Sequence, residues 1–188
     1  RPGLLRVWVR GCRSLPLRER GGPRCCLFGQ VPRQVTVQVS EIEPARAGGR
    51  ERSDSGRGRS DSSLSSGGRA LPATYQARGG QQDLNGDVSF PTGATCRFVQ
   101  TTLGSGWRLR FEVQDEGLSM RAVPLAFAEI GADDLARQGE WRLLLSDPRT
   151  YEAVYGGPNE AGVVRAPAFL LVHTQACAPG DAGPARLP

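Results

Sequence analysis

Residues 107–115 read WRLRFEVQD, and the alternation of apolar and charged residues in this stretch decides the fold class. Four large apolar residues occupy every second position: Trp107, Leu109, Phe111 and Val113. The positions between them hold Arg108, Arg110 and Glu112. A period of two residues is that of a β-strand with one face in the core and the other in water. We therefore predict a half-buried strand that ends at the acidic pair of Asp115 and Glu116.

The same period recurs along the rest of the chain. Residues 4–10 alternate in this way and place three residues on the outer face, Arg6, Trp8 and Arg10. Further strand-like stretches are 25–31, 35–39, 74–78, 84–90, 94–100, 123–130, 141–147 and 166–175. One short helix is expected from Asp133 to Arg137, closed by Gly139. Short strands with Gly- and Pro-rich connections predict an all-β fold, an eight-stranded antiparallel β-sandwich.

The composition also predicts segments outside the sandwich. The chain has 25 Gly and 14 Pro, and residues 44–70 contain a single large apolar residue, Leu64. Such a segment cannot bury enough surface to offset the entropy of ordering it, so we expect a disordered Arg/Ser/Gly insertion. The sandwich is then split into residues 1–43 and 71–175, followed by a disordered tail at 176–188. Serines beside arginines at 52–55 and 59–62 could accept phosphate, and a linker without that use is the alternative.

The charge of the chain is basic and unevenly placed. All 24 basic residues are arginine, the formal net charge is +5, and residues 1–24 carry seven arginines against one acid, Glu19. This pattern permits contact with phosphate groups or with an acidic partner, and an ordinary solvated surface is the alternative. Arg6, Arg10, Arg108 and Arg110 are expected on outer strand faces, where they could form a basic patch.

The chain lacks the usual signatures of an enzyme. It has no G-x-S-x-G turn and no Gly-rich phosphate loop with a lysine, so we expect no catalytic residues, no cofactor and no small-molecule substrate. Asp133 and Asp134 form an acidic pair, but acids are common in the first turn of a helix. The arginines of SGRGRS at 55–60 have no aromatic residue between them, and we expect no specific nucleic acid as a partner. No apolar run approaches the roughly 18 residues that cross a bilayer.

The five cysteines indicate a reduced, intracellular protein. Their number is odd, they form no CxxC pair, and Cys12 and Cys96 fall in apolar-patterned stretches. We expect core thiols in place of disulfides. His173 is the single histidine, and nothing near it in the sequence provides an activating partner for a Cys–His nucleophile.

The order of these stretches resembles a C2 domain, an eight-stranded β-sandwich used in membrane and protein docking. The specific part is LRFEVQD at 109–115, followed by AFAEIG at 126–131 and GEWRLLL at 139–145. At the front, GLLRVWVRGCRSLP at 3–16 resembles the opening strand of that family. In calcium-binding members, two loops at one end of the sandwich supply about five acidic side chains, because Ca²⁺ needs six to eight oxygen ligands.

The resemblance implies that the calcium site of this chain is degenerate. The first loop, PLRERGGPRCC at 16–26, has one acid, Glu19, between two arginines. The second loop offers Asp115 and Glu116, with no further acid as far as Arg121. We expect no bound metal here. The use we expect for Asp115 and Glu116 is a salt contact with the arginines of the first loop, Arg18, Arg20 and Arg24.

The same loop end is the candidate contact surface. Its residues are basic or apolar: Arg18, Arg20, Arg24, Leu118, Met120 and Arg121. The function implied by the resemblance is a non-catalytic, calcium-independent docking or scaffold module in a larger intracellular protein, located in the cytoplasm, at the cytoskeleton or at a membrane periphery. Another protein is the first partner expected. An anionic phospholipid membrane, bound through arginines, is the second.

Overall fold

The computed structural model describes residues 3–19, 30–42, 75–100, 108–116, 122–135, 137–156 and 166–177. The insertion predicted at 44–70 lies outside these residues, as does the tail from 178 onward. The described elements, in chain order, are β1 (Gly3–Arg13), β2 (Arg18–Glu19), β3 (Gln30–Val31), β4 (Gln34–Ile42), β5 (Tyr75–Gln82), β6 (Val88–Gln100), β7 (Arg108–Asp115), β8 (Val123–Gly131), α1 (Ala132–Leu135), β9 (Gly139–Leu144), β10 (Tyr155–Gly156), β11 (Ala166–Pro167) and β12 (Phe169–Cys177).

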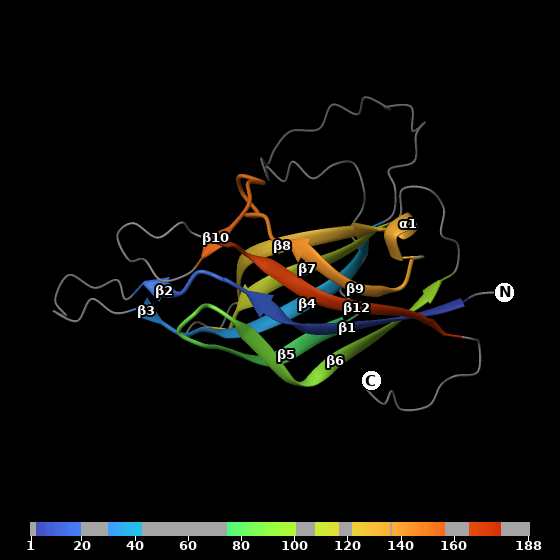
Figure 1. The fold of residues 1–188 in the computed structure, drawn as a ribbon, viewed down its shortest axis with the longest axis horizontal. Helices are drawn as coiled ribbons and strands as arrows, with labels where there is room; N and C mark the ends of the chain where they lie inside the picture. The colour runs from blue at the N-terminus through green and yellow to red at the C-terminus, as the bar shows by residue number, and fades with distance from the viewer. Residues whose placement is uncertain are drawn as a thin grey trace, which may run out of the picture.

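Eight of these strands form a continuous antiparallel sheet in the order β8-β7-β4-β5-β6-β1-β12-β9. The sheet divides into two layers, because β5 and β6 pair only beside their connecting turn, through Gln81 with Ser89 and Gln82 with Val88. The layers are β8-β7-β4-β5 and β6-β1-β12-β9, and they pack together in Figure 1. The predicted eight-stranded antiparallel sandwich is confirmed.

The core is built by the alternation that the sequence shows. Leu109, Phe111 and Val113 of β7 have no exposed surface, while Arg108 is exposed and Glu112 is half-buried. The neighbouring strand β4 contributes three valines at the same spacing, Val35, Val37 and Val39. Each such side chain stabilises the fold by roughly 1.5–3 kcal/mol when it leaves water. The face predicted for WRLRFEVQD is therefore correct at its described positions, and Trp107 lies outside them.

Trp8 does not lie in water as its position in the alternation predicted. Its side chain is only 2% exposed, although it projects from the face of β1 opposite to Val7 and Val9. The cross-strand partner of Trp8 on β12 is His173, and the two rings lie 5.0 Å apart at 53°. An aromatic side chain packs on its neighbours within the same sheet face, so a period of two does not by itself identify the exposed side.

The far edges of the two layers approach each other at one point. Phe127 of β8 and Ser146, just after β9, form an isolated antiparallel bridge. Between β8 and β9 the chain makes the predicted short helix, which ends before Gly139 at a φ of 133°. Residues 151–163, predicted as a loop, contain strand β10, which pairs with β11.

Candidate functional site

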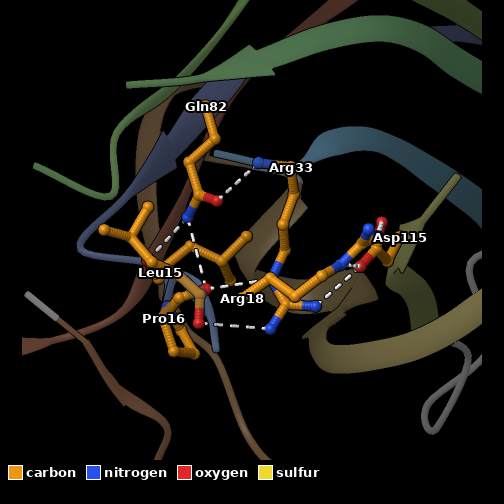
Figure 2. A network of polar contacts seen from close by, with 7 residues as sticks. Leu15, Pro16, Arg18, Arg33, Gln82 and Asp115 are labelled. Atoms are coloured by element: carbon orange, nitrogen blue, oxygen red, sulfur yellow. Dashed lines mark hydrogen bonds and ion pairs between the residues drawn. The ribbon is translucent and has the colours of Figure 1, made fainter. Parts of the chain in front are cut away.

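The carboxylate of Asp115 at the end of β7 contacts two arginines that come from distant parts of the sequence (Figure 2). Arg18 donates from Nη2 to Oδ1 at 2.5 Å and from Nε to Oδ2 at 3.2 Å. Arg33 donates from Nη1 to Oδ2 at 2.6 Å. The Asp115 side chain is 5% exposed, that of Arg33 is 15% exposed and that of Arg18 is 34% exposed. The hydrogen bond to Asp115, and then its charge, raise the pKa of Arg18.

Arg33 ties the loop end together because its three guanidinium nitrogens reach three groups. Besides the bond to Asp115, Nε donates to the carbonyl of Pro16 at 3.1 Å and Nη2 to the carbonyl of Leu17 at 3.3 Å. Arg33 lies between β3 and β4, while Pro16 and Leu17 connect β1 to β2. One planar guanidinium therefore fixes the first connection to the end of β7, a geometry that a lysine could not reproduce.

Gln82, at the end of β5, fixes the same connection from the other side. Its Nε2 donates to the carbonyls of Leu15 at 2.7 Å and Pro16 at 3.3 Å. Its Oε1 accepts the backbone N–H of Arg33 at 3.0 Å. Gln82 is 5% exposed, so each of these bonds satisfies a group that has left water. Figure 2 shows Gln82 and Arg33 on either side of the Leu15–Pro16 backbone.

The backbone of residues 14–16 is held by the turn after β5 as well. Leu15 donates its N–H to the carbonyl of Gly86 at 2.8 Å, and Ser14 donates its own to Asp87 Oδ1 at 3.0 Å. Gly86 has a φ of 87°, and a Cβ there would lie 2.5 Å from the Leu15 oxygen. A Cβ at Gly156 would lie 1.9 Å from the Ser14 oxygen. The connection that leads into the first loop is thus fixed on several sides.

Glu116 has a different contact from the one predicted. Its carboxylate accepts a hydrogen bond from the Thr36 hydroxyl on β4, and its N–H donates to the Gln34 carbonyl at 2.9 Å. The prediction that Asp115 and Glu116 both meet first-loop arginines is therefore correct for Asp115 with Arg18 and wrong for Glu116 within the described residues. Hydrogen bonding to β4 extends the β7 pairing by one residue.

The other predicted site residues are only partly described. Glu19 is described by its backbone in β2. Five of the contact residues lie outside the described ranges: Arg20, Arg24, Leu118, Met120 and Arg121. Among the residues that the structure describes, no three His, Cys, Asp or Glu side chains gather as metal ligands would.

Sequence reasoning missed Arg33 and Gln82. Gln82 lies on the same side of β5 as Gly80 and Ala77, which are buried, so a polar residue at an inward position was the available signal. Arg33 precedes the alternating valines of β4 and had no such signal, because its partners come from residues 16, 17 and 115. Only the paired strands bring these positions together.

The basic patch predicted on the outer strand faces is partly neutralised. Arg108 and Arg110 both contact Glu129 of β8, at 3.3 and 3.2 Å. The guanidinium of Arg110 also lies 4.1 Å above the Phe127 ring, and its side chain is 21% exposed. Arg110 is therefore a half-buried structural residue. The two arginines share one carboxylate and form no row of free positive charge.

No family model and no curated protein matches this sequence. Two solved structures are similar to the fold, each with 11% sequence identity. A C2 domain of plant Extended Synaptotagmin 1, its domain A, aligns with a TM-score of 0.48 over 94% of this chain and 95% of that one. Human GIVD cytosolic phospholipase A2 aligns with a TM-score of 0.46 over 93% of this chain, which spans 16% of the phospholipase. The first of these structures is a C2 domain, the family that the sequence resembles.

No helix among the described residues is long and apolar enough to span a membrane.

Proposed function

We propose that this chain is a non-catalytic docking module that binds another protein without calcium, as part of a larger intracellular protein. The observation that carries the proposal is the occupancy of Asp115. Both oxygens of its carboxylate accept hydrogen bonds from guanidinium groups, of Arg18 and Arg33, at the loop end where the resemblance would have placed a calcium site.

The charges of this cluster oppose a divalent cation. Ca²⁺ requires six to eight oxygens and is favoured by clustered carboxylates. Here one carboxylate is balanced by two guanidinium groups, so the described cluster carries a net charge of about +1. A calcium ion would have to displace bonds of 2.5 and 2.6 Å and would then lie beside two positive charges.

The fixed connection at residues 14–17 supports a docking role. Gln82, Arg33 and the Gly86 turn fix its backbone, and Leu15 and Leu17 are buried beneath it. The loop that begins at Arg18 therefore starts from a rigid base. A rigid surface loses less conformational entropy when a partner binds, so more of the contact energy remains as affinity.

An anionic membrane is the second candidate partner, and one observation favours it. Arg18 is 34% exposed although it is bonded to Asp115, and the cluster keeps an excess of positive charge. A basic side chain near an anionic lipid surface contributes about 1 kcal/mol, which falls with ionic strength. Binding through a few arginines would be weak and sensitive to salt.

Sedimentation with phosphatidylserine vesicles separates the two partners. We predict that the chain stays in the supernatant at physiological salt, with Ca²⁺ or with a chelator. Pelleting only with Ca²⁺ would refute the proposal. Pelleting in both conditions that is abolished when Arg18, Arg20 and Arg24 are changed to Glu would place the membrane first. Arg78→Glu, the same charge change at an exposed position of β5, is the matched control.

A further inference from the structure

Strand β9 forms one edge of the sheet, and one of its two long sides has no strand beside it among the described residues. On the inner side it pairs with β12 over its whole length, from Gly139 opposite Thr174 to Leu144 opposite Phe169. On the outer side, the contact with β8 is a single bridge between Ser146 and Phe127, beyond the end of β9. From that bridge the two strands diverge toward α1 (Figure 1).

The hydrogen bonds at the end of β9 show which way its backbone groups point. Leu145 donates to the Ala168 carbonyl at 2.9 Å, on the β12 side. Ser146 exchanges two bonds with Phe127, at 2.8 and 2.9 Å, on the β8 side. Because these directions alternate along a strand, the N–H and C=O groups of the even-numbered residues point away from β12. These residues are Glu140, Arg142 and Leu144.

The outward backbone groups of these three residues have no strand partner in the described part of the chain. Their side chains are exposed as well, and Leu144 keeps 47% of its surface in water. An edge with regularly spaced free donors and acceptors is a template for an added strand. Three alternate outward residues span five positions, the usual length of a short strand.

We propose that the outer edge of β9 binds an extended segment of a partner protein by strand addition. This second docking surface is independent of the Asp115 cluster. The side chains of β9 set the partner's sequence, because cross-strand pairs favour opposite charges. A strand that runs antiparallel to β9 would carry an apolar residue opposite Leu144, an acid opposite Arg142 and a base opposite Glu140. Its pattern is apolar-x-acidic-x-basic.

The charges of the edge disfavour a second copy of this chain. Antiparallel self-pairing centred on Arg142 would place two arginines opposite each other and Leu144 opposite Glu140. A register shifted by two residues would pair Glu140 with Arg142, but would place Leu144 opposite Gln138. The φ of Gln138 is 42°, so that residue is not extended and the ladder would end there. A partner with the complementary pattern can pair along the whole edge.

A synthetic peptide tests the proposal on the whole chain. The probe is a blocked seven-residue peptide in which threonines alternate with valine, glutamate and lysine in that order, and a control peptide has lysine in place of glutamate. The readout is amide exchange and chemical shift by NMR. In the free chain the amides of Trp141 and Leu143 should be protected and those of Glu140, Arg142 and Leu144 should exchange fast. The probe should slow exchange at these three amides.

Two substitutions make the result specific. Arg142→Pro removes an outward N–H without breaking a bond to β12, so it should leave the β12 amides protected and abolish peptide binding, while Arg142→Thr should keep binding. Arg142→Glu should weaken the probe and strengthen the control peptide, each by roughly fivefold. Absent or unsaturable shifts at these three amides would overturn the proposal, as would binding that survives Arg142→Pro. Protection that rises with protein concentration alone would also overturn it, in favour of a second copy.

Discussion

The Arg33→Met substitution tests whether Arg33 holds the loop end together. It keeps an unbranched apolar stem of similar length and removes the guanidinium with its bonds to Asp115, Pro16 and Leu17. Removing one partner of a buried ion pair costs about 3–5 kcal/mol. The Arg33 side chain is 15% exposed and that of Asp115 is 5%, so the pair belongs to this class. Arg18 still compensates Asp115 in the variant, and we expect the lower value, about 3 kcal/mol.

Arg18→Met is the comparison. The Arg18 side chain is 34% exposed and bonds to Asp115 alone among the described residues, so its loss should cost about 1 kcal/mol or less. The double variant leaves Asp115 buried without either guanidinium, and its cost should exceed the sum of the two single costs. For a chain of this size, the loss in Arg33→Met corresponds to a Tm lower by roughly 10 °C.

Urea unfolding, monitored by tryptophan fluorescence, measures all three variants, with Tm from calorimetry as a second reading. The expected order of destabilisation is the double variant, then Arg33→Met, then Arg18→Met. If Arg33→Met cost no more than Arg18→Met, Arg33 would not be the residue that joins the connection to β7. Additive costs would show that the two arginines do not share Asp115.

Three other outcomes follow from single positions. Gly156→Ala should cost about 3 kcal/mol in urea unfolding because its Cβ would meet backbone atoms, the Ser14 oxygen at 1.9 Å first, whereas Gly79→Ala, with φ of 78° and no atom within 4 Å, should cost about 1; equal costs would contradict this. Burial, and then the charge of Asp87, raise the pKa of the Cys12 thiol to about 12, so iodoacetamide at about pH 8 should modify Cys12 only after unfolding, as read by peptide mass spectrometry; alkylation of the folded chain would refute this. Backbone hydrogen bonds from Arg149 and Thr150 lower the pKa of Asp147 below 3.8; its contribution to stability is present above the unfolded pKa and is lost as the pH falls through the folded one, so Asp147→Asn should flatten the stability profile below about pH 4, and a carboxyl titrating at or above 3.8 by NMR would be evidence against it.

The fold was predictable because its signal is local. Alternation in single stretches, such as the one around Phe111, identifies a strand and its inner face without knowledge of the partners. The bend between the layers was also partly visible, since Asn85 and Gly86 predicted the turn that joins β5 to β6. Trp8 shows the limit of this reasoning: the period gives two faces, and the His173 ring across the strand decides that both are buried.

The loop end was only half predictable for a physical reason. The pairing of Asp115 with Arg18 could be expected, because both residues fall in loops that the resemblance places together. Arg33 and Gln82 could not, because hydrogen bonds to backbone carbonyls leave no pattern in the sequence. The free edge of β9 was likewise invisible before the strand order was known.

Calcium titration of the folded chain, observed at the guanidinium Nε–H signals of Arg18 and Arg33 by NMR, tests the central claim most directly. We predict that both signals keep their shifts and slow exchange up to millimolar Ca²⁺, because Asp115 remains bonded to arginine. Saturable shifts of both signals, with a Tm that rises as Ca²⁺ is added, would show that calcium displaces the arginines and would contradict a calcium-independent module.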